Sequence, residues 1–216
     1  MYHNFMESAI QPLFFIAILI LSVVIHEVSH GYAALALGDR TAQDAGRLTL
    51  NPLPHMDLFG SVLLPLLLVI SQSPILIGWA KPVPFNPHHL RNQKWGPAIV
   101  GAAGPLANVS LAVVFGLVLR FLPDLAGGAS RAFALNFMSI AGTIALLNLG
   151  LAIFNLVPIP PLDGSKVLFA FLPYKWRGLE YMLEHYGFFL LLIFIFFFSR
   201  WLAPIILFIF RLITGS

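Results

Sequence analysis

The sequence predicts an all-α, polytopic membrane protein, and its composition is the first observation that does so. Of its 216 residues, 59% are hydrophobic and only 10% are Asp, Glu, Lys or Arg. An average soluble domain carries roughly 25% charged residues, so this chain has too few charges to cover a globule of its size. A mean hydropathy of +0.88 agrees. We therefore expect the chain to lie in a lipid bilayer.

Long apolar segments, the second observation, give the order of the elements. Membrane helices are expected over 10–37, 97–121 and 132–157, each long enough to cross a hydrocarbon core of about 30 Å at about 1.5 Å per residue. The C-terminal segment 186–213 is expected to form either one tilted span or a hairpin. The whole chain, 1–216, is predicted to be a single membrane-embedded domain of about five to six membrane segments.

The segment 58–95 does not read as a simple span. Pro65 and a second break at 71–74 divide its apolar part into pieces too short to cross, which favours a re-entrant element. Residues 78–84 contain two prolines that keep the chain out of helix, so an extended stretch is expected there. A short interfacial helix is expected over 164–172.

The basic residues and the missing cysteines exclude further classes. Although the formal net charge is +3, the twelve Lys and Arg residues are scattered, so no nucleic-acid partner is expected. The sequence contains no cysteine, which rules out disulfides and thiolate metal sites. No Lys or Arg precedes the first apolar segment. That segment therefore lacks the basic start of a cleaved signal peptide and is expected to be retained.

A polar cluster near the end of the first segment, His26, Glu27 and His30, needs a chemical reason, because charged groups in a membrane span cost roughly 2.5–3.5 kcal/mol each. On a helix the two imidazoles of His-Glu-x-x-His lie one turn apart, so both can reach one cation. Glu27 lies about 100° around the axis, where it can face a water at that cation. Zinc suits two imidazoles and an oxygen ligand. A buried polar network or proton relay is the alternative.

A zinc site of this kind needs a third protein ligand, and the residues alone do not choose it. The candidates are His55, His88, His89, His185 and Asp163. Asp163 is equally suited to cap the helix that follows it. Asn108 and Asn155 could equally be hydrogen-bonding residues between helices in lipid.

Three motifs, in this order, show what the chain resembles. They are His26-Glu27-x-x-His30, Gly104-Pro105-Leu106-Ala107-Asn108 and Asn155-x-x-Pro158-x-Pro160-x-x-Asp163-Gly164. Over roughly Ser22–Lys166 the chain resembles the site-2 protease family of intramembrane zinc metalloproteases. No PDZ insertion or CBS domain is visible, so it resembles a minimal member.

The resemblance implies one Zn²⁺ per chain and a role for the polar residues of the motifs. His26, His30 and Asp163 would bind the metal. Glu27 would be the catalytic base, and Asn155 would hold the substrate or the oxyanion. These roles are what membership of the family would bring to the chain.

The resemblance also points to residues that would bind substrate. Asn108 is one candidate, in a helix-packing motif close to the site. Gly78, Trp79 and Ala80 are the others, because 78–84 resembles the strand-forming stretch that the family places beside the active site. The resemblance therefore implies a short β element there. An extended substrate could pair with such a stretch by strand addition.

A metal site built in this way also sets the topology. The ends of 10–37 and 132–157 must meet at one face, so these helices run parallel, 97–121 runs the other way, and 58–95 returns to the face that it left. Ten of the twelve basic residues then divide eight to two, and Arg200 and Arg211 in the C-terminal segment stay unassigned. A full crossing by 58–78 would remove the bias. On one side are Arg40, Arg47, Lys81, Arg91, Lys94, Lys166, Lys175 and Arg177, and on the other are Arg120 and Arg131. The positive-inside rule places the active site toward the cytoplasmic face, with the N-terminus outside, in a bacterial or archaeal cell membrane.

The expected function is zinc-dependent cleavage of peptide bonds in the transmembrane segments of membrane protein substrates. A metal or proton transporter that uses the same residues as a relay is the alternative. Transporters often show paired repeats with broken helices, whereas here each motif occurs once. A non-catalytic scaffold would be expected to have lost Glu27, which is present. The sequence predicts neither the substrate's identity nor the oligomeric state.

Overall fold

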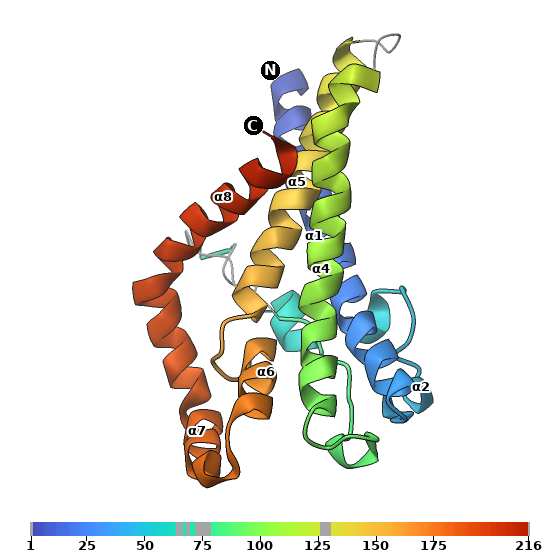
Figure 1. Cartoon of the computed structure of the whole chain (residues 1–216). Coiled ribbons are helices and arrows are strands. Elements are labelled where there is room, and N and C mark those ends of the chain that lie inside the picture. The colour runs from blue at the N-terminus through green and yellow to red at the C-terminus, as the bar shows by residue number, and fades with distance from the viewer. Residues whose placement is uncertain (1, 64–66, 68–69, 72–78, 126–130, 216) are drawn as a thin grey trace.

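The computed structural model describes residues 2–63, 67, 70–71, 79–125 and 131–215, and within these it is a bundle of helices with no assigned strand (Figure 1). The longer helices are α1 (Tyr2–Ala36), α4 (Gly96–Leu125), α5 (Arg131–Asn155), α6 (Asp163–Phe171), α7 (Arg177–Ile193) and α8 (Leu202–Thr214). Four helical stretches of the described residues are long and apolar enough to cross a membrane: Phe14–Ala36, Gly96–Phe121, Ala134–Asn155 and Tyr174–Thr214. An all-α fold with several membrane-spanning helices is thus confirmed.

Three helices form the centre of the bundle, where α4 contacts both α1 and α5. In Figure 1, α1 and α5 run down from the end that holds the N-terminus, whereas α4 runs up toward that end. The first and third of these helices are therefore parallel, and α4 is antiparallel to both. This arrangement brings the C-terminal end of α5 close to the C-terminal half of α1, as a shared metal site requires.

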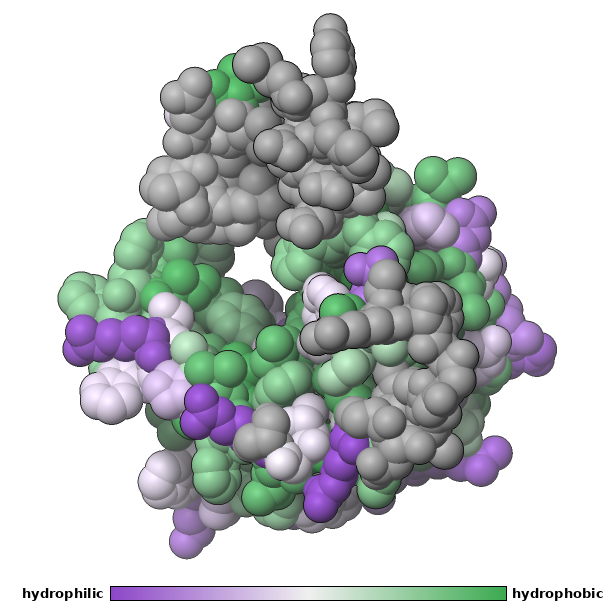
Figure 2. Space-filling view, turned by 90° about the horizontal axis from the view of Figure 1, so that it is seen from above, coloured by the Kyte–Doolittle hydropathy of each residue, from purple (hydrophilic) through white to green (hydrophobic). Residues whose placement is uncertain are grey.

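Small side chains allow the central helices to approach each other closely. Buried alanines lie on all three helices: Ala34 on α1, Ala98 and Ala112 on α4, and Ala141, Ala145 and Ala152 on α5. Small residues are typical of helix interfaces in lipid, because a large apolar side chain gains little by leaving hydrocarbon for protein. Large apolar side chains such as Phe121 and Phe208 are instead exposed. Figure 2, a view of one face from above, shows hydrophobic residues over much of its coloured part, with hydrophilic ones mostly toward the rim.

The C-terminal part of the chain follows one bent helical path in Figure 1, from α7 at the lower end to α8 beside the N-terminal end. A π-helical turn (η5, Phe194–Phe198) and a 3-10 turn (η6, Ser199–Trp201) join the two helices at the bend. In α8 the side chain of Ile213 lies over Gly116 of α4, where a β-carbon would come within 2.6 Å of it. This close approach packs the end of the tail against the central helices.

Short elements and extended chain surround the lower end of the bundle. They are α2 (Thr41–Asp44), η1 (Leu53–His55), η2 (Leu58–Leu63), η3 (Pro87–His89) and η4 (Tyr174–Trp176). Part of the segment 58–95 lies outside the described residues. The described remainder holds η2, η3, single helical residues at 67 and 70, and irregular chain. The re-entrant course, the β element and the count of five to six segments therefore stay predictions.

The extended chain from 79 to 86 is held in place by polar side chains beneath it. Arg47 is buried and donates to the main-chain carbonyl oxygen of Lys81 at 2.7 Å. Asp39 is fully buried and accepts a hydrogen bond from the main-chain N–H of Asn86 at 2.6 Å. Burial raises the pKa of the Asp39 carboxyl, but the hydrogen bonds that it accepts outweigh burial and hold that pKa below its usual range. An ionised Asp39 thus fixes one end of the extended chain and Arg47 the other.

Candidate metal centre

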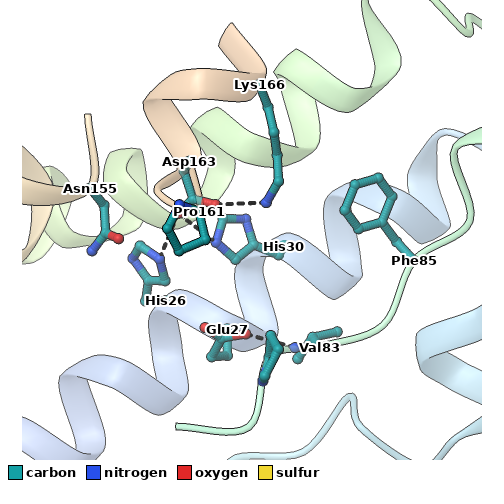
Figure 3. A pocket seen from close by; sticks show the side chains of 10 residues that line it. His26, Glu27, His30, Val83, Phe85, Asn155, Pro161, Asp163 and Lys166 are labelled. Atoms are coloured by element: carbon teal, nitrogen blue, oxygen red, sulfur yellow. Dashed lines mark hydrogen bonds and ion pairs between the residues drawn. The ribbon is translucent and has the colours of Figure 1, made fainter. Parts of the chain in front are cut away.

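Both histidines of the His-Glu-x-x-His motif face one point beside α1. His26 and His30 are buried, with ring centroids 4.6 Å apart and ring planes at 87°. Their Nε2 atoms lie 3.0 and 3.1 Å from the same atom, Oδ2 of Asp163 (Figure 3). Three side chains from α1 and α6 therefore meet at a single position.

The other ring nitrogens of the two histidines face acceptors on α4. His30 Nδ1 donates to the main-chain carbonyl oxygen of Val100 at 2.6 Å, and His26 Nδ1 lies 2.5 Å from Oδ1 of Asn108. A neutral imidazole that donates from Nδ1 presents a lone pair at Nε2. Because Oδ2 of Asp163 is also an acceptor, three acceptor atoms converge and require a shared cation. Protons on the imidazoles or a bound metal ion could meet this requirement.

This donor set fits zinc. Two imidazole nitrogens and one carboxylate oxygen, with a further position open, form the usual protein ligands of a catalytic zinc ion. Metal-binding histidines also commonly donate their second ring N–H to a carbonyl or similar acceptor, as His26 and His30 do here. The residues present are therefore suited to hold the metal.

Asp163 does not cap the helix that it begins. The N-cap position of α6 belongs to Leu162, and no side chain makes a capping hydrogen bond there. The Asp163 carboxylate instead contacts His26 and His30 through Oδ2 and accepts from Lys166 Nζ at 2.9 Å through Oδ1. Burial raises the pKa of this carboxyl, but its contacts with the imidazoles and the charge of Lys166 outweigh burial and hold that pKa well below its usual range.

The remaining candidates for a third ligand make other contacts. His55 bonds through Nε2 to a loop carbonyl oxygen 2.9 Å away, and His89 lies 3.3 Å from the carboxylate of a buried aspartate. His185 stacks on a tyrosine ring of α7, and His88 is exposed on η3. Among the described residues, Asp163 is the one candidate that contacts both motif histidines.

Two glycines make the close approach of these elements possible. A β-carbon at Gly104 of α4 would lie 2.5 Å from Nε2 of His30 and 2.6 Å from Nε2 of His26. A β-carbon at Gly164 would lie 2.2 Å from the carbonyl oxygen of Leu156. The glycine of Gly-Pro-Leu-Ala-Asn is therefore required by packing against the two histidines, and the glycine of Asp-Gly by packing against the main chain that follows α5.

Glu27 reaches the same cavity from the other side of the histidines (Figure 3). Its Oε2 accepts a hydrogen bond from the main-chain N–H of Val83 at 2.8 Å. The candidate ligand atoms of His26, Glu27 and His30 all lie within 4.8 Å of one another. The cavity has a volume of about 140 Å³ and is lined by His26, Glu27, His30, Pro82, Val83, Phe85, Asn155, Pro161, Asp163 and Lys166. The carboxylate of Glu27 can thus face a water molecule placed beside the three converging ligand atoms.

The predicted substrate-binding residues are placed differently from one another. Asn155, at the end of α5, lines the cavity and donates from Nδ2 to a carbonyl oxygen of its own helix at 2.9 Å. Asn108 is fully buried behind His26 and does not line the cavity. Trp79 and Ala80 also lie outside the lining, and Gly78 lies outside the described residues. Contact of any of these five residues with substrate stays a prediction.

Five lining residues were not among the site residues predicted from the sequence: Pro82, Val83, Phe85, Pro161 and Lys166. Val83 contributes a main-chain N–H, which leaves no side-chain signal. The ammonium nitrogen of Lys166 lies over the ring of Phe85, 5.5 Å from the ring centre. Lys166 follows Asp163 by three residues on α6, a spacing that places two helical side chains on one face and could have indicated the pair.

The fold and the site together define a metalloprotease of the His-Glu-x-x-His type set among membrane-spanning helices. The chain belongs to peptidase family M50, whose model matches residues 14–194. This finding confirms the site-2 protease resemblance. The protein is therefore a zinc metalloprotease and an integral membrane protein.

Relatives of known name agree with this assignment. The chain is 35% identical over 175 residues to YwhC of Bacillus subtilis (strain 168), covering 81% of this chain and 76% of the relative. It is 30% identical over 168 residues to Rip2 of Mycolicibacterium smegmatis, covering 74% of this chain and 61% of the relative. Both bear the name "Putative zinc metalloprotease". "Zinc metalloprotease MJ0392" of Methanocaldococcus jannaschii is 26% identical over 163 residues, 76% of this chain and 35% of its own length. No solved structure gives a significant match.

Proposed function

We propose that this metalloprotease cleaves peptide bonds within the transmembrane segments of membrane protein substrates, with His26, His30 and Asp163 as its zinc ligands. The observation that carries the proposal is the convergence of three acceptor atoms, within 3.0–3.1 Å, on a buried position between α1, α4 and α6. The ligands on α1 lie inside a membrane-spanning helix. A substrate must therefore be cut in the membrane or close to it.

The side chains around this position supply the remaining chemistry. Zinc, when bound, acts as a Lewis acid that activates water and polarises the scissile carbonyl. Glu27 accepts the proton of the attacking water and passes it to the leaving nitrogen. Asn155 uses one amide N–H within α5, and its second N–H can donate to the developing oxyanion.

The extended chain beside Glu27 is suited to hold an unwound substrate. A helical substrate hides its carbonyl groups in its own hydrogen bonds, so it must unwind before attack, and an unwound segment can pair with an extended strand. Pro82 and Pro84 carry no N–H, and the N–H of Val83 is engaged by Glu27. Pairing along this stretch would therefore use mainly its carbonyl groups.

Purified protein reconstituted in lipid vesicles with tagged single-span reporter proteins tests the proposal. Cleavage is expected within the reporter's membrane segment, located by mass spectrometry of the fragments. A chelator should stop it, and added zinc should restore it. Cleavage confined to the soluble tags, or zinc-dependent ion flux without cleavage, would contradict the proposal. The transporter alternative has no support from the relatives described above, which are named as metalloproteases.

We also propose that the active site opens toward the cytoplasm of a bacterial or archaeal cell. The lower end of the bundle in Figure 1 carries α2, α6 and the start of α7, and the basic residues of these parts and their loops supply the positive side of the predicted bias. The end that holds the N-terminus would then lie outside. The chain has no cysteine, so single introduced cysteines can report this orientation.

A membrane-impermeant maleimide applied to intact cells should label Thr214→Cys, near the C-terminal end of α8, and not Gln93→Cys. The latter lies in the exposed loop before α4. Gln93→Cys should react with the maleimide only after the membrane is permeabilised. The reverse labelling pattern would contradict the cytoplasmic assignment.

A further inference from the structure

A buried polar network lies behind the metal centre, on the side away from the cavity. Ser22 of α1, Asn108 of α4 and Asn148 of α5 are each 3% exposed or less, and none lines the cavity. Asn108 Nδ2 donates to Asn148 Oδ1 at 2.6 Å, and Asn148 Nδ2 donates to Ser22 Oγ at 2.9 Å. Through Oδ1 of Asn108 the network ends on Nδ1 of His26.

Two main-chain carbonyl groups set the direction of the hydrogen bonds in this network: that of Ile144 faces Asn148, and that of Ser22 accepts from Asn108 Nδ2 at the longer distance of 3.4 Å. Asn148 also faces the carbonyl oxygen of Ile144 at 2.9 Å, and a carbonyl can only accept. The Asn148 amide must therefore present its NH₂ to Ile144 and its oxygen to Asn108. Asn108 must therefore donate from its NH₂ to that oxygen, which leaves the Asn108 oxygen facing His26. His26 Nδ1 is then the donor, and its Nε2 keeps the lone pair.

The two histidines differ in how this orientation is secured. His30 donates to the main-chain oxygen of Val100, which cannot be exchanged for a donor. His26 depends on the amide of Asn108, whose NH₂ is held by Asn148 Oδ1 at 2.6 Å and, at the longer distance of 3.4 Å, by the main-chain oxygen of Ser22. Without the shorter bond, this amide could rotate by 180° and present its NH₂ to Nδ1 instead. A rotated amide would favour the imidazole tautomer that carries its proton on Nε2, and this tautomer cannot bind a metal through Nε2.

We propose that Asn148 is a positioning residue for the zinc site. It acts through Asn108 and holds His26 in the tautomer that binds metal. This inference rests on the proposed function to the extent that His26 is a zinc ligand. Neither Asn148 nor Ser22 belongs to the motifs on which the family resemblance rests. Their contribution follows from the hydrogen bonds that they make between α1, α4 and α5.

The test is the zinc dissociation constant of the full-length protein in detergent, measured by competition with a chelator of known affinity. Asn148→Leu removes both the donor and the acceptor at nearly constant size. It should raise the zinc Kd by about 10–100-fold, as loss of an outer contact to a metal ligand typically does. Cobalt bound in place of zinc should show a shifted visible absorption spectrum in the same variant. Asn148→Ala, which replaces the amide by a smaller side chain, should act in the same direction if the leucine variant does not fold.

Leu149→Ala is the matched control, because Leu149 is the neighbouring buried residue of α5 and makes no part of the network. It should lower the melting temperature and leave the zinc Kd unchanged. An equal rise of the zinc Kd in the Leu149 and Asn148 variants would overturn the proposal. An unchanged zinc Kd in both Asn148 variants would also overturn it. His26→Ala distinguishes failure of the role of Asn148 from failure of the proposed zinc site. If His26→Ala leaves zinc binding intact, His26 is not a ligand and the proposed function fails. If His26→Ala loses zinc while both Asn148 variants keep it, only the role of Asn148 is wrong.

Discussion

Replacing Glu27 by Gln is expected to abolish measurable cleavage while zinc stays bound. Gln has the size of Glu, and its amide oxygen can still accept the hydrogen bond from the main-chain N–H of Val83. It cannot take a proton from water, and a positioned acid or base contributes about 10²–10⁴-fold to the rate. Cleavage of a transmembrane reporter and zinc content, measured on the same preparation, check both halves of the prediction.

Glu184→Gln provides the control for this experiment. Glu184 lies exposed on α7, away from the cavity lining, and its replacement should change neither zinc content nor cleavage. If Glu27→Gln keeps cleavage within about tenfold of the wild type, a loss smaller than a general base supplies, Glu27 is not the base. If it loses zinc together with activity, Glu27 is a ligand instead.

Gly104→Ala is expected to have the second largest effect, through the metal itself. A single added β-carbon would lie 2.5 and 2.6 Å from the Nε2 atoms of His30 and His26. The rings cannot simply turn away, because their Nδ1 atoms are bonded to acceptors on the same helix, α4. The zinc Kd should therefore rise by about 100-fold or more, at or beyond the upper end of the loss typical of an outer-shell change.

Gly142→Ala is the corresponding control on α5. A β-carbon there would meet its nearest neighbour, Leu119, at 3.8 Å, which is ordinary contact. This variant should bind zinc as the wild type does. Wild-type zinc affinity in Gly104→Ala would show that the two histidines do not lie against α4 as described. Chelator competition on both variants decides between these results.

The local sequence carried enough information for one part of the site and too little for another. The spacing of His26, Glu27 and His30 on a helix predicts a shared cation because helical geometry is periodic and known. Asp163 lies 137 residues from His26, and its neighbours in sequence suit a helix cap equally well. Only the resemblance to a family selected it as a ligand. In the structure, the fold brings α6 to α1 across α4.

Residues that act through the main chain or through another side chain were the hardest to predict. Val83 contributes an N–H that every residue except proline possesses. Asn148 is a lone amide in an apolar segment, a pattern that equally predicts a simple hydrogen bond between helices. Its significance depends on the direction of its bond to Asn108, which only a three-dimensional arrangement defines. The observed end of a helix can also differ from the predicted one: α4 continues to Leu125, whereas hydropathy alone predicted an end near 121.

The most direct test of the zinc site is the zinc content per protein of the wild type and of Asp163→Ala, by elemental analysis after purification in detergent. We expect close to one zinc per chain in the wild type and a collapse of this ratio in the variant, because the carboxylate would supply one of three ligands. A residue that only capped α6 would cost about 1 kcal/mol of stability and leave zinc in place. An unchanged ratio in Asp163→Ala, or no zinc in the wild type, would contradict the proposed metal centre.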